Sequence, residues 1–297
     1  MDKHIGIIGL GIMGGAFARN LVQSGWRVIG YDVDAQRNAA AKAAGVEIAH
    51  SAEAVAEVAA DIILSLPTAL AVLDTAKVIA AVPQDGSARR TVVEASTLAL
   101  PDKLAVKDIL EPAGHTVLDC PMSGTGAQAA VKDLVVYASG DSAAIARLQP
   151  LFLGFARKVY DLGEYGNGSR MKFVANHLVA IHNVAAAEAM VLAMKAGLEP
   201  HRVVEVIGSG AGTSRMFEVR APMMAANAYL PATMRSATWK KDMDVIGDFA
   251  SELACPTPLF DLSASLYTAA LAMGRGAEDT AAVCAVLEKM AGLERKA

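Results

Sequence analysis

The sequence predicts an α/β protein: a Rossmann-type, doubly wound sheet domain followed by an all-α carboxyl-terminal domain. Short apolar, β-branched runs alternate with helical stretches up to about residue 162. A glycine-rich turn joins the first run to the first helical stretch. Beyond residue 162 the strand signals fade and Ala-, Met- and Leu-rich helical segments continue to the end. We therefore expect a nucleotide-binding domain over residues 1–162 and a helical domain over residues 163–297.

The first element is an apolar strand over residues 5–8, followed directly by GLGIMG at residues 9–14. A helix is expected next, then a second strand over residues 27–31 that ends at Asp32. Strand, G-x-G-x-x-G turn, helix, strand and acid is the order of a dinucleotide-binding unit. A glycine-rich turn without a ligand is the simpler alternative, but it does not account for this whole order.

Each part of the turn has a physical role toward a dinucleotide. Gly9 permits the tight turn, Gly11 lets a pyrophosphate approach the backbone, and Gly14 lets helix and strand pack closely. Asp32 can accept both ribose hydroxyls and repels a 2′-phosphate, which favours NAD; Arg37 lies nearby in sequence and keeps NADP open. The turn residues expected at the cofactor are Gly9, Leu10, Gly11, Ile12, Met13 and Gly14.

The remaining strands of the first domain are expected at residues 46–49, 61–66, 91–94, 116–119 and 134–138. Near-continuous apolar runs such as DIILSLP indicate a parallel sheet covered on both faces. Ligands of such sheets bind beyond the carboxyl ends of the strands. The segments 66–68, 94–97 and 119–124, which follow three of these strands, are therefore candidate site loops.

Composition narrows the classes of function. The chain has 54% hydrophobic residues and a net charge of −4 without a basic block, so no nucleic-acid surface is indicated. Three cysteines without CxxC spacing do not form a disulfide framework and fit a reducing cytoplasm. The apolar stretch over residues 171–197 contains several polar residues, so we expect no membrane segment. The apolar helical half is expected to form a homodimer or homotetramer.

Lys172 is the candidate for proton transfer. Gly168, Lys172 and Asn176 are spaced to share one helix face, and Met171 and Phe173 flank the lysine with apolar surface. Desolvation lowers a lysine pKa and suits it to general acid–base chemistry, with an amide nearby to hold a substrate oxygen. A lysine that only reaches water from an amphipathic helix remains the alternative.

No metal site is expected. His177 and His182 are five residues apart, so they point to different faces of a helix and cannot share a metal.

Seven motifs together resemble the β-hydroxyacid dehydrogenase family, which includes 3-hydroxyisobutyrate dehydrogenases, tartronate semialdehyde reductases and L-threonate dehydrogenases. The resemblance spans essentially the whole chain. The motifs are GLGIMG at 9–14, LPT at 66–68, EAST at 94–97, DCPMSG at 119–124, GSRMKFVAN at 168–176, KKD at 240–242 and GRGAEDTAA at 274–282.

The resemblance implies an NAD(P)-dependent oxidoreductase that moves hydride between a nicotinamide and a small β-hydroxy acid. It makes Lys172 the general acid and base. It implies substrate contacts, including those to the substrate carboxylate, from Ser123, Gly124, Thr125, Asn176 and Ser214. It implies further cofactor contacts from Leu66, Pro67, Ser96, Thr97 and Lys241, with Asp242 beside the lysine.

Departures from the family pattern concern the substrate. Thr125 stands where the family has a second glycine, Lys132 occupies another usual glycine position, and Glu94 replaces a common aspartate. The segment from Ser214 to Arg220 resembles the threonate-dehydrogenase branch and would suit a polyhydroxylated acid. Arg220 has two alternative roles: it contacts the substrate together with Ser214, or it forms a structural ion pair.

Two other functions remain open. An imine or carbonyl reductase on this scaffold generally replaces the catalytic lysine, which this chain retains. A non-catalytic dinucleotide-binding regulator would have no reason to keep Lys172, Asn176 and Ser123 together. A decarboxylating 6-phosphogluconate enzyme is disfavoured because the helical half is too short.

Overall fold

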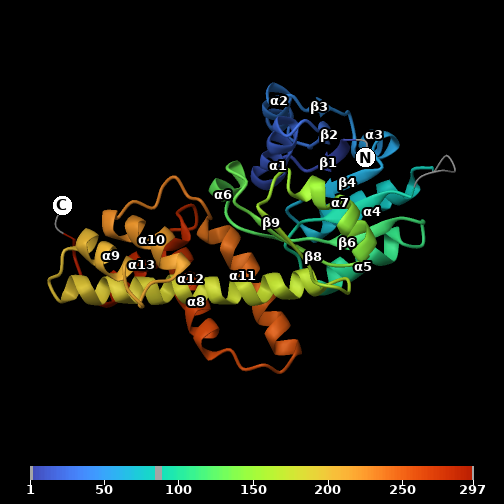
Figure 1. The fold of residues 1–297 in the computed structure, drawn as a ribbon. Helices are drawn as coiled ribbons and strands as arrows, with labels where there is room; N and C mark the ends of the chain where they lie inside the picture. Colours follow the sequence, from blue (N-terminus) through green and yellow to red (C-terminus); the bar gives the residue numbers. More distant parts are fainter. Residues whose placement is uncertain (1–2, 84–88, 296–297) are drawn as a thin grey trace. The chain divides into compact units, whose positions relative to one another are not determined.

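The computed structural model describes residues 3–83 and 89–295 and divides the chain into two compact units (Figure 1). The first unit is Met1–Lys172 and the second is Phe173–Ala297. The division falls inside helix α8 (Asn167–Lys195), whereas the sequence placed the domain boundary in the loop before it.

A parallel sheet forms the centre of the first unit, as the sequence predicts. Its six strands are β1 (His4–Ile8), β2 (Arg27–Tyr31), β3 (Glu47–Ile48), β4 (Asp61–Leu64), β5 (Thr91–Glu94) and β6 (Thr116–Asp119). Their spatial order is β3-β2-β1-β4-β5-β6, so the chain reverses direction across the sheet between β1 and β4. Such a switch point is where doubly wound sheets bind ligands.

Helices cover both faces of this sheet. They are α1 (Ile12–Gln23), α2 (Ala35–Ala43), α3 (Ala52–Val58), α4 (Ala69–Ala81), α5 (Leu100–Leu110), α6 (Gly126–Ala130) and α7 (Ser142–Phe152). Successive strand residues face opposite sides, so Ile7 packs with Phe17 of α1 while Ile8 packs with Val72 of α4 in a separate cluster. Burial on both faces explains why the strands are apolar without alternation.

A second, three-stranded sheet follows the first. It consists of β7 (Met122–Ser123), β8 (Val135–Ala138) and β9 (Lys158–Asp161), with β7 antiparallel and β9 parallel to β8. The sequence predicted β8 but grouped it with the parallel sheet, and it missed β7 and β9. Asp119 and Ser139 exchange both backbone hydrogen bonds and so join the ends of β6 and β8.

The second unit is helical. Besides most of α8 it contains α9 (Pro200–Gly208), α10 (Arg215–Ala226), α11 (Ser236–Glu252), α12 (Pro258–Ala272), the 3₁₀ turn η1 (Thr280–Ala282) and α13 (Val283–Met290). In the sequence, GLEP at 197–200, GSGAGTS at 208–214, ACPTP at 254–258 and GRG at 274–276 predict breaks between helices, and all four lie where one of these helices gives way to the next. The connection over residues 227–235 was not predicted.

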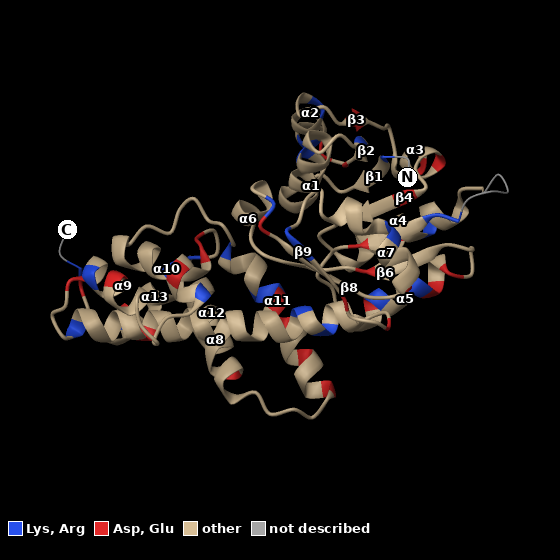
Figure 2. Ribbon diagram, viewed as in Figure 1, with Lys and Arg blue, Asp and Glu red and all other residues tan. Residues whose placement is uncertain are grey.

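By length and composition alone, α8 is the single described helix that could cross a membrane, and it carries few charges along its middle (Figure 2). Its polar residues nevertheless make contacts inside the helical unit. The buried Asn183 donates to the Tyr267 hydroxyl at 3.2 Å, and His177 stacks on Phe260 with 5.2 Å between ring centroids. These contacts are those of a core helix.

Candidate active site at the carboxyl edge of the sheet

The loops that follow β1, β2, β4, β5 and β6 meet at one edge of the sheet, because parallel strands all end there. This edge collects most of the residues that the sequence singled out in the first unit. They are Gly9, Leu10, Gly11, Ile12, Met13, Gly14, Asp32, Leu66, Pro67, Ser96, Thr97, Ser123, Gly124 and Thr125.

Two glycines of the first turn are required by the fold itself. Gly9 has φ +95°, and a Cβ there would lie 2.2 Å from the Ser65 carbonyl oxygen. A Cβ on Gly14 would lie 1.9 Å from the Gly9 carbonyl oxygen. Gly11 is different, since a Cβ there would meet no protein atom closer than Arg37 Nη1 at 3.9 Å. The absence of a side chain at Gly11 therefore leaves open space on its outer side, which fits a pyrophosphate.

The start of α1 also fits an anion. Gly11 is the N-cap residue of α1, and it provides no side-chain cap to the first turn. The first turn holds no acidic residue. Backbone N–H groups and the positive end of the helix dipole at such a terminus attract phosphate.

Asp32 shapes the turn as well as following β2. Its buried carboxylate accepts the Leu10 N–H at 2.8 Å and the Asp34 N–H at 2.9 Å. Arg37 Nη1 lies 3.4 Å from the same carboxylate. The sequence predicted a ribose contact for Asp32 and missed this bond to Leu10, because it joins residues that are 22 apart.

Ser96 ties two site loops together. Its hydroxyl accepts the Leu66 N–H at 3.0 Å, and its own N–H donates to Glu94 Oε1 at 2.9 Å. Ser96 is buried, whereas Thr97 is half-buried and Pro67 is exposed. Ser96 therefore sets the shape of the loops after β4 and β5, and Thr97 and Pro67 offer more surface to a ligand.

The loop after β6 presents Ser123 and Gly124. Ser123 is half-buried in β7, and Gly124 has φ +138°, with Leu134 Cδ2 only 2.5 Å from the position of a Cβ. Thr125 forms a capping box with Gln128: its N–H donates to Gln128 Oε1 at 3.0 Å, and its hydroxyl accepts the Gln128 N–H at 3.4 Å. Both polar groups of Thr125 are thus engaged in capping α6.

Helix α6 rests on α1. Asn20 Nδ2 donates to the Ala129 carbonyl at 2.7 Å, and Lys132 Nζ donates to the Ser24 hydroxyl at 2.7 Å. A Cβ on Gly126 would lie 2.6 Å from Ile12 Cγ2. The segment that carries Ser123 is therefore attached to the helix that begins at the glycine turn.

The first turn of α8 packs against the ends of β6 and β8. A Cβ on Gly168 would lie 2.4 Å from the Tyr137 carbonyl oxygen and 2.6 Å from that of Asp119. Ser169 donates its N–H and its hydroxyl to the Asp119 carboxylate at 2.7 and 2.8 Å. Lys172 follows one turn after Gly168 and is 9% exposed, which confirms its predicted burial. Asn176, a further turn along α8, is also buried.

The helical unit resolves one alternative. Arg220 is buried and forms an ion pair with Asp279 at 2.7 Å, so the structural-ion-pair alternative is correct. Ser214 is the N-cap of α10, where its hydroxyl accepts the Phe217 N–H at 3.1 Å. Lys241 is half-exposed and lies 3.3 Å from the Asp242 carboxylate.

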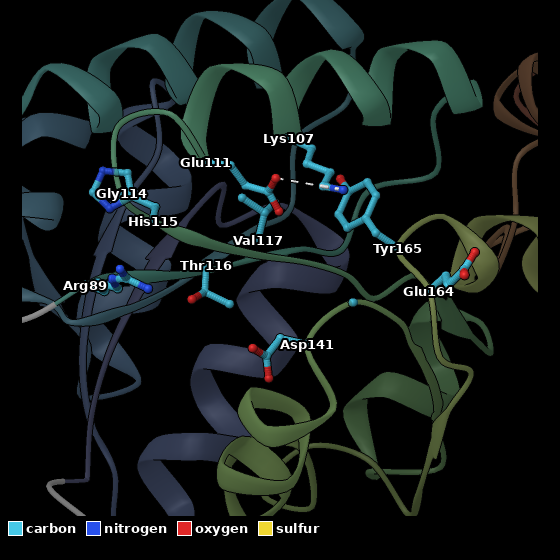
Figure 3. Close-up of a pocket in the computed structure, with 11 residues that line it drawn as sticks. Arg89, Lys107, Glu111, Gly114, His115, Thr116, Val117, Asp141, Glu164 and Tyr165 are labelled. Carbon is cyan, nitrogen blue, oxygen red and sulfur yellow. Dashed lines mark ion pairs between the residues drawn. The ribbon is translucent and has the colours of Figure 1, made fainter.

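A cavity of about 590 Å³ lies elsewhere in the first unit (Figure 3). Lys107, Glu111 and Tyr165 line one side, with Lys107 Nζ 5.6 Å from the centre of the Tyr165 ring. Thr116, the first residue of β6, is also in the lining, so this cavity is at the amino edge of the strands, away from the glycine turn. Among residues 3–83 and 89–295, no group of three or more His, Cys, Asp or Glu could hold a metal ion.

Two family models match the chain. Residues 4–163 match the NAD binding domain of 6-phosphogluconate dehydrogenase. Residues 166–287 match the NAD-binding domain of NADP-dependent 3-hydroxyisobutyrate dehydrogenase.

Similar proteins span the same length. An L-threonate dehydrogenase of Escherichia coli O6:H1 is 33% identical, over 95% of this chain and 94% of its own. The structure of a 3-hydroxyisobutyrate dehydrogenase from Salmonella typhimurium is 32% identical, with a TM-score of 0.85 over 95% of this chain and 99% of its own. That of a Mycobacterium tuberculosis 3-hydroxyisobutyrate dehydrogenase with L-serine is 28% identical, with a TM-score of 0.86 over 97% and 99%.

Proposed function

Because this chain belongs to the β-hydroxyacid dehydrogenase family, we propose that it oxidises the hydroxyl group of a small β-hydroxy acid with Lys172 as general base. The chain is an NAD(P)-dependent dehydrogenase of hydroxy acids, in agreement with the names of its relatives. The imine-reductase and regulator alternatives are therefore set aside. The observation that carries the proposal is the buried Lys172, one turn after the attachment of α8 to the carboxyl edge of the sheet.

The chemistry divides between cofactor and protein. A nicotinamide held at the glycine turn would supply the hydride acceptor for the alcohol carbon. Lys172 accepts the hydroxyl proton as the hydride leaves, and it returns that proton when the carbonyl is reduced. Asn176, on the same helix, holds the substrate oxygen. The residues proposed at the cofactor are those of the glycine turn, Asp32 and, with them, Leu66, Pro67, Ser96, Thr97 and Lys241.

The substrate we propose is a short carboxylate such as L-threonate. Similarity to L-threonate dehydrogenases supports a four-carbon sugar acid. Arg220 gives no support for a polyhydroxylated substrate, because its buried guanidinium is paired with Asp279. Ser214 stays a proposed contact in addition to its capping bond. The test is a comparison of kcat/KM for L-threonate, D-glycerate, 3-hydroxyisobutyrate and L-serine; a kcat/KM for L-threonate no higher than for the other three acids would contradict the proposed substrate.

Ser123→Ala is expected to raise KM for the acid substrate. Ser123 and the Gly124 N–H remain the proposed carboxylate anchors, since Thr125 is engaged in capping α6. A hydrogen bond to a charged group contributes about 1.5–3 kcal/mol, so KM should rise roughly ten- to hundredfold. Steady-state kinetics at saturating NAD measures it, and the Kd for NADH serves as the control. An unchanged KM would remove Ser123 from the anchor.

Asp32→Asn is expected to lower the preference for NAD over NADP. The amide keeps one acceptor oxygen, which can serve the Leu10 N–H but not the Asp34 N–H as well, and it removes the negative charge that repels a 2′-phosphate. With Arg37 beside it, the ratio of kcat/KM for the two cofactors should shift toward NADP by about tenfold or more. An unchanged ratio, with the melting temperature preserved, would mean that Asp32 does not face the ribose.

We further propose a cytoplasmic enzyme that forms a homodimer or homotetramer through its helical unit. Large apolar side chains are exposed on that unit, and burying them would stabilise an assembly. They include Leu192, Leu198, Val206, Leu253, Leu259 and Leu262. Sedimentation of the purified protein tests this, and a monomer at micromolar concentration would contradict it.

A further inference from the structure

A buried ion triad lies at the carboxyl ends of β5 and β6. Lys103 of α5 contacts the Glu94 carboxylate directly, and its Nζ lies 3.0 Å from Asp119 Oδ1. All three side chains are 0% exposed. Burial acts to lower the pKa of Lys103, but Glu94 and Asp119 outweigh it, so the pKa is raised and the ammonium stays charged.

A contribution to folding stability does not by itself explain why the chain has a buried ion triad here. Removing charges from water is costly, and buried ion pairs can often be replaced by apolar side chains at no loss of stability. The triad contains two carboxylates and one ammonium, so the second carboxylate charge must be stabilised by additional hydrogen-bond donors. The Ser96 N–H serves Glu94 at 2.9 Å, and the N–H and hydroxyl of Ser169 serve Asp119.

The bonds from Ser169 connect the triad to α8. Asp119 accepts both donors of Ser169, at the positive end of that helix. The preceding Gly168 N–H donates to Ser139 Oγ at 2.9 Å, and Ser139 Oγ in turn donates to the Asp119 carbonyl at 3.1 Å. The first turn of α8 is thus held from two sides by Asp119, and the next turn carries Lys172.

We propose that the Lys103–Glu94–Asp119 triad is a positioning device for the proton-transfer lysine. Lys103 holds the Asp119 carboxylate in place, and Asp119 sets the position of the first turn of α8 so that the Lys172 amine meets the substrate hydroxyl. Glu94, longer by one methylene than the aspartate common there in the family, pairs with the same Lys103 ammonium. This inference rests on the proposed role of Lys172.

The chain offers a matched control at the other edge of the same sheet. Arg147 pairs with Asp61, the first residue of β4, at 2.8 Å and also donates to Thr91, the first residue of β5, at 2.7 Å. This network joins a helix to strands β4 and β5 as the triad does for β5 and β6, but within residues 3–83 and 89–295 its hydrogen bonds do not reach the start of α8.

The experiment compares Lys103→Met with Arg147→Met in the full-length protein. Because a 1 Å misplacement of a catalytic group can cost about a hundredfold in rate, kcat of Lys103→Met should fall by about tenfold to a hundredfold. KM for NAD should rise by less than kcat falls, since the glycine turn is untouched and Ser96 keeps its own bonds to Glu94 and Leu66. Arg147→Met should lower the melting temperature without lowering kcat.

A second substitution separates positioning from packing. Without Lys103, the Glu94 and Asp119 carboxylates stay buried and lose the ammonium that both contact, so their repulsion is no longer offset. Glu94→Gln added to Lys103→Met removes one of the two charges and so the repulsion on Asp119, so kcat should recover by at least about threefold, whereas a defect of packing alone would deepen with the second change. If Lys103→Met does not fold, Ser169→Ala replaces it, with the same expected loss of kcat at unchanged KM for NAD.

Three results would overturn the inference: full kcat in a folded Lys103→Met or Ser169→Ala variant, an equal loss of kcat in Arg147→Met, or a further loss in the double variant. Retained turnover in Lys172→Ala would instead overturn the proposed function. The two failures are therefore distinguishable.

Discussion

Lys172→Ala is expected to lose turnover while the protein keeps its cofactor affinity. A positioned general acid or base contributes about 10²–10⁴-fold, so kcat should fall by at least about a hundredfold in both reaction directions. The Kd for NADH should stay within about threefold, because the glycine turn and Asp32 provide the proposed cofactor contacts. Stopped-flow absorbance of NADH and its fluorescence on binding measure the two quantities.

Arg170→Ala is the matched control for this prediction. Arg170 is an exposed cation on the same helix, and its side chain bonds locally, to Asn167 Oδ1 at 2.8 Å. It should therefore keep its kcat. Turnover that survives in Lys172→Ala would exclude the lysine as acid and base, and loss of NADH binding would place the lysine at the cofactor instead.

Gly11→Ala is expected to abolish useful cofactor binding without unfolding the protein. The backbone of Gly11, at φ −66°, suits alanine, and the added methyl overlaps no protein atom of the described residues, with Arg37 Nη1 at an ordinary contact distance of 3.9 Å. The methyl instead fills the space through which we propose the pyrophosphate approaches α1. The Kd for NADH should rise by at least about tenfold, a loss of 1.4 kcal/mol or more, with the melting temperature unchanged.

Gly14→Ala provides the contrast within the same turn. Its methyl would overlap the Gly9 carbonyl, so this variant should lose stability before it loses any specific contact. If Gly11→Ala binds NADH as tightly as the parent protein, the pyrophosphate does not lie against Gly11, and the assigned role of the turn is wrong.

Local sequence patterns predicted the architecture and the edge at which the site lies. The G-x-G-x-x-G turn, the apolar runs and the acid at position 32 are signals within about 30 residues, and the parallel sheet then brings distant loops to one edge. Two strands were not predicted from the sequence. Strand β7 has only two residues, and strand β9 is mostly exposed. Neither length nor apolar periodicity could reveal them.

Pairings between distant polar residues were beyond the sequence. Ser169 and Asp119 are 50 residues apart, and Arg220 and Asp279 are 59 apart, so only the folded chain shows which charge meets which donor. Thr125 is a different case. Thr125 and Gln128 have the spacing of a capping box, so this helix start could have been predicted from the sequence. The family resemblance instead led to an interpretation of Thr125 as a replaced glycine at the substrate.

The attachment of α6 to α1 has a thermodynamic consequence for the two ligands. The side chains of Asn20 and Lys132 form a bracket: their hydrogen bonds link α1, at whose start we propose the pyrophosphate binds, to the α6 segment that follows the proposed carboxylate anchors. If dinucleotide binding stiffens this bracket and tightens the acid by some factor, reciprocity requires the acid to tighten the dinucleotide by the same factor. Two polar side chains distant from any bond being broken can thereby govern whether NAD and acid bind independently or as a cooperative pair.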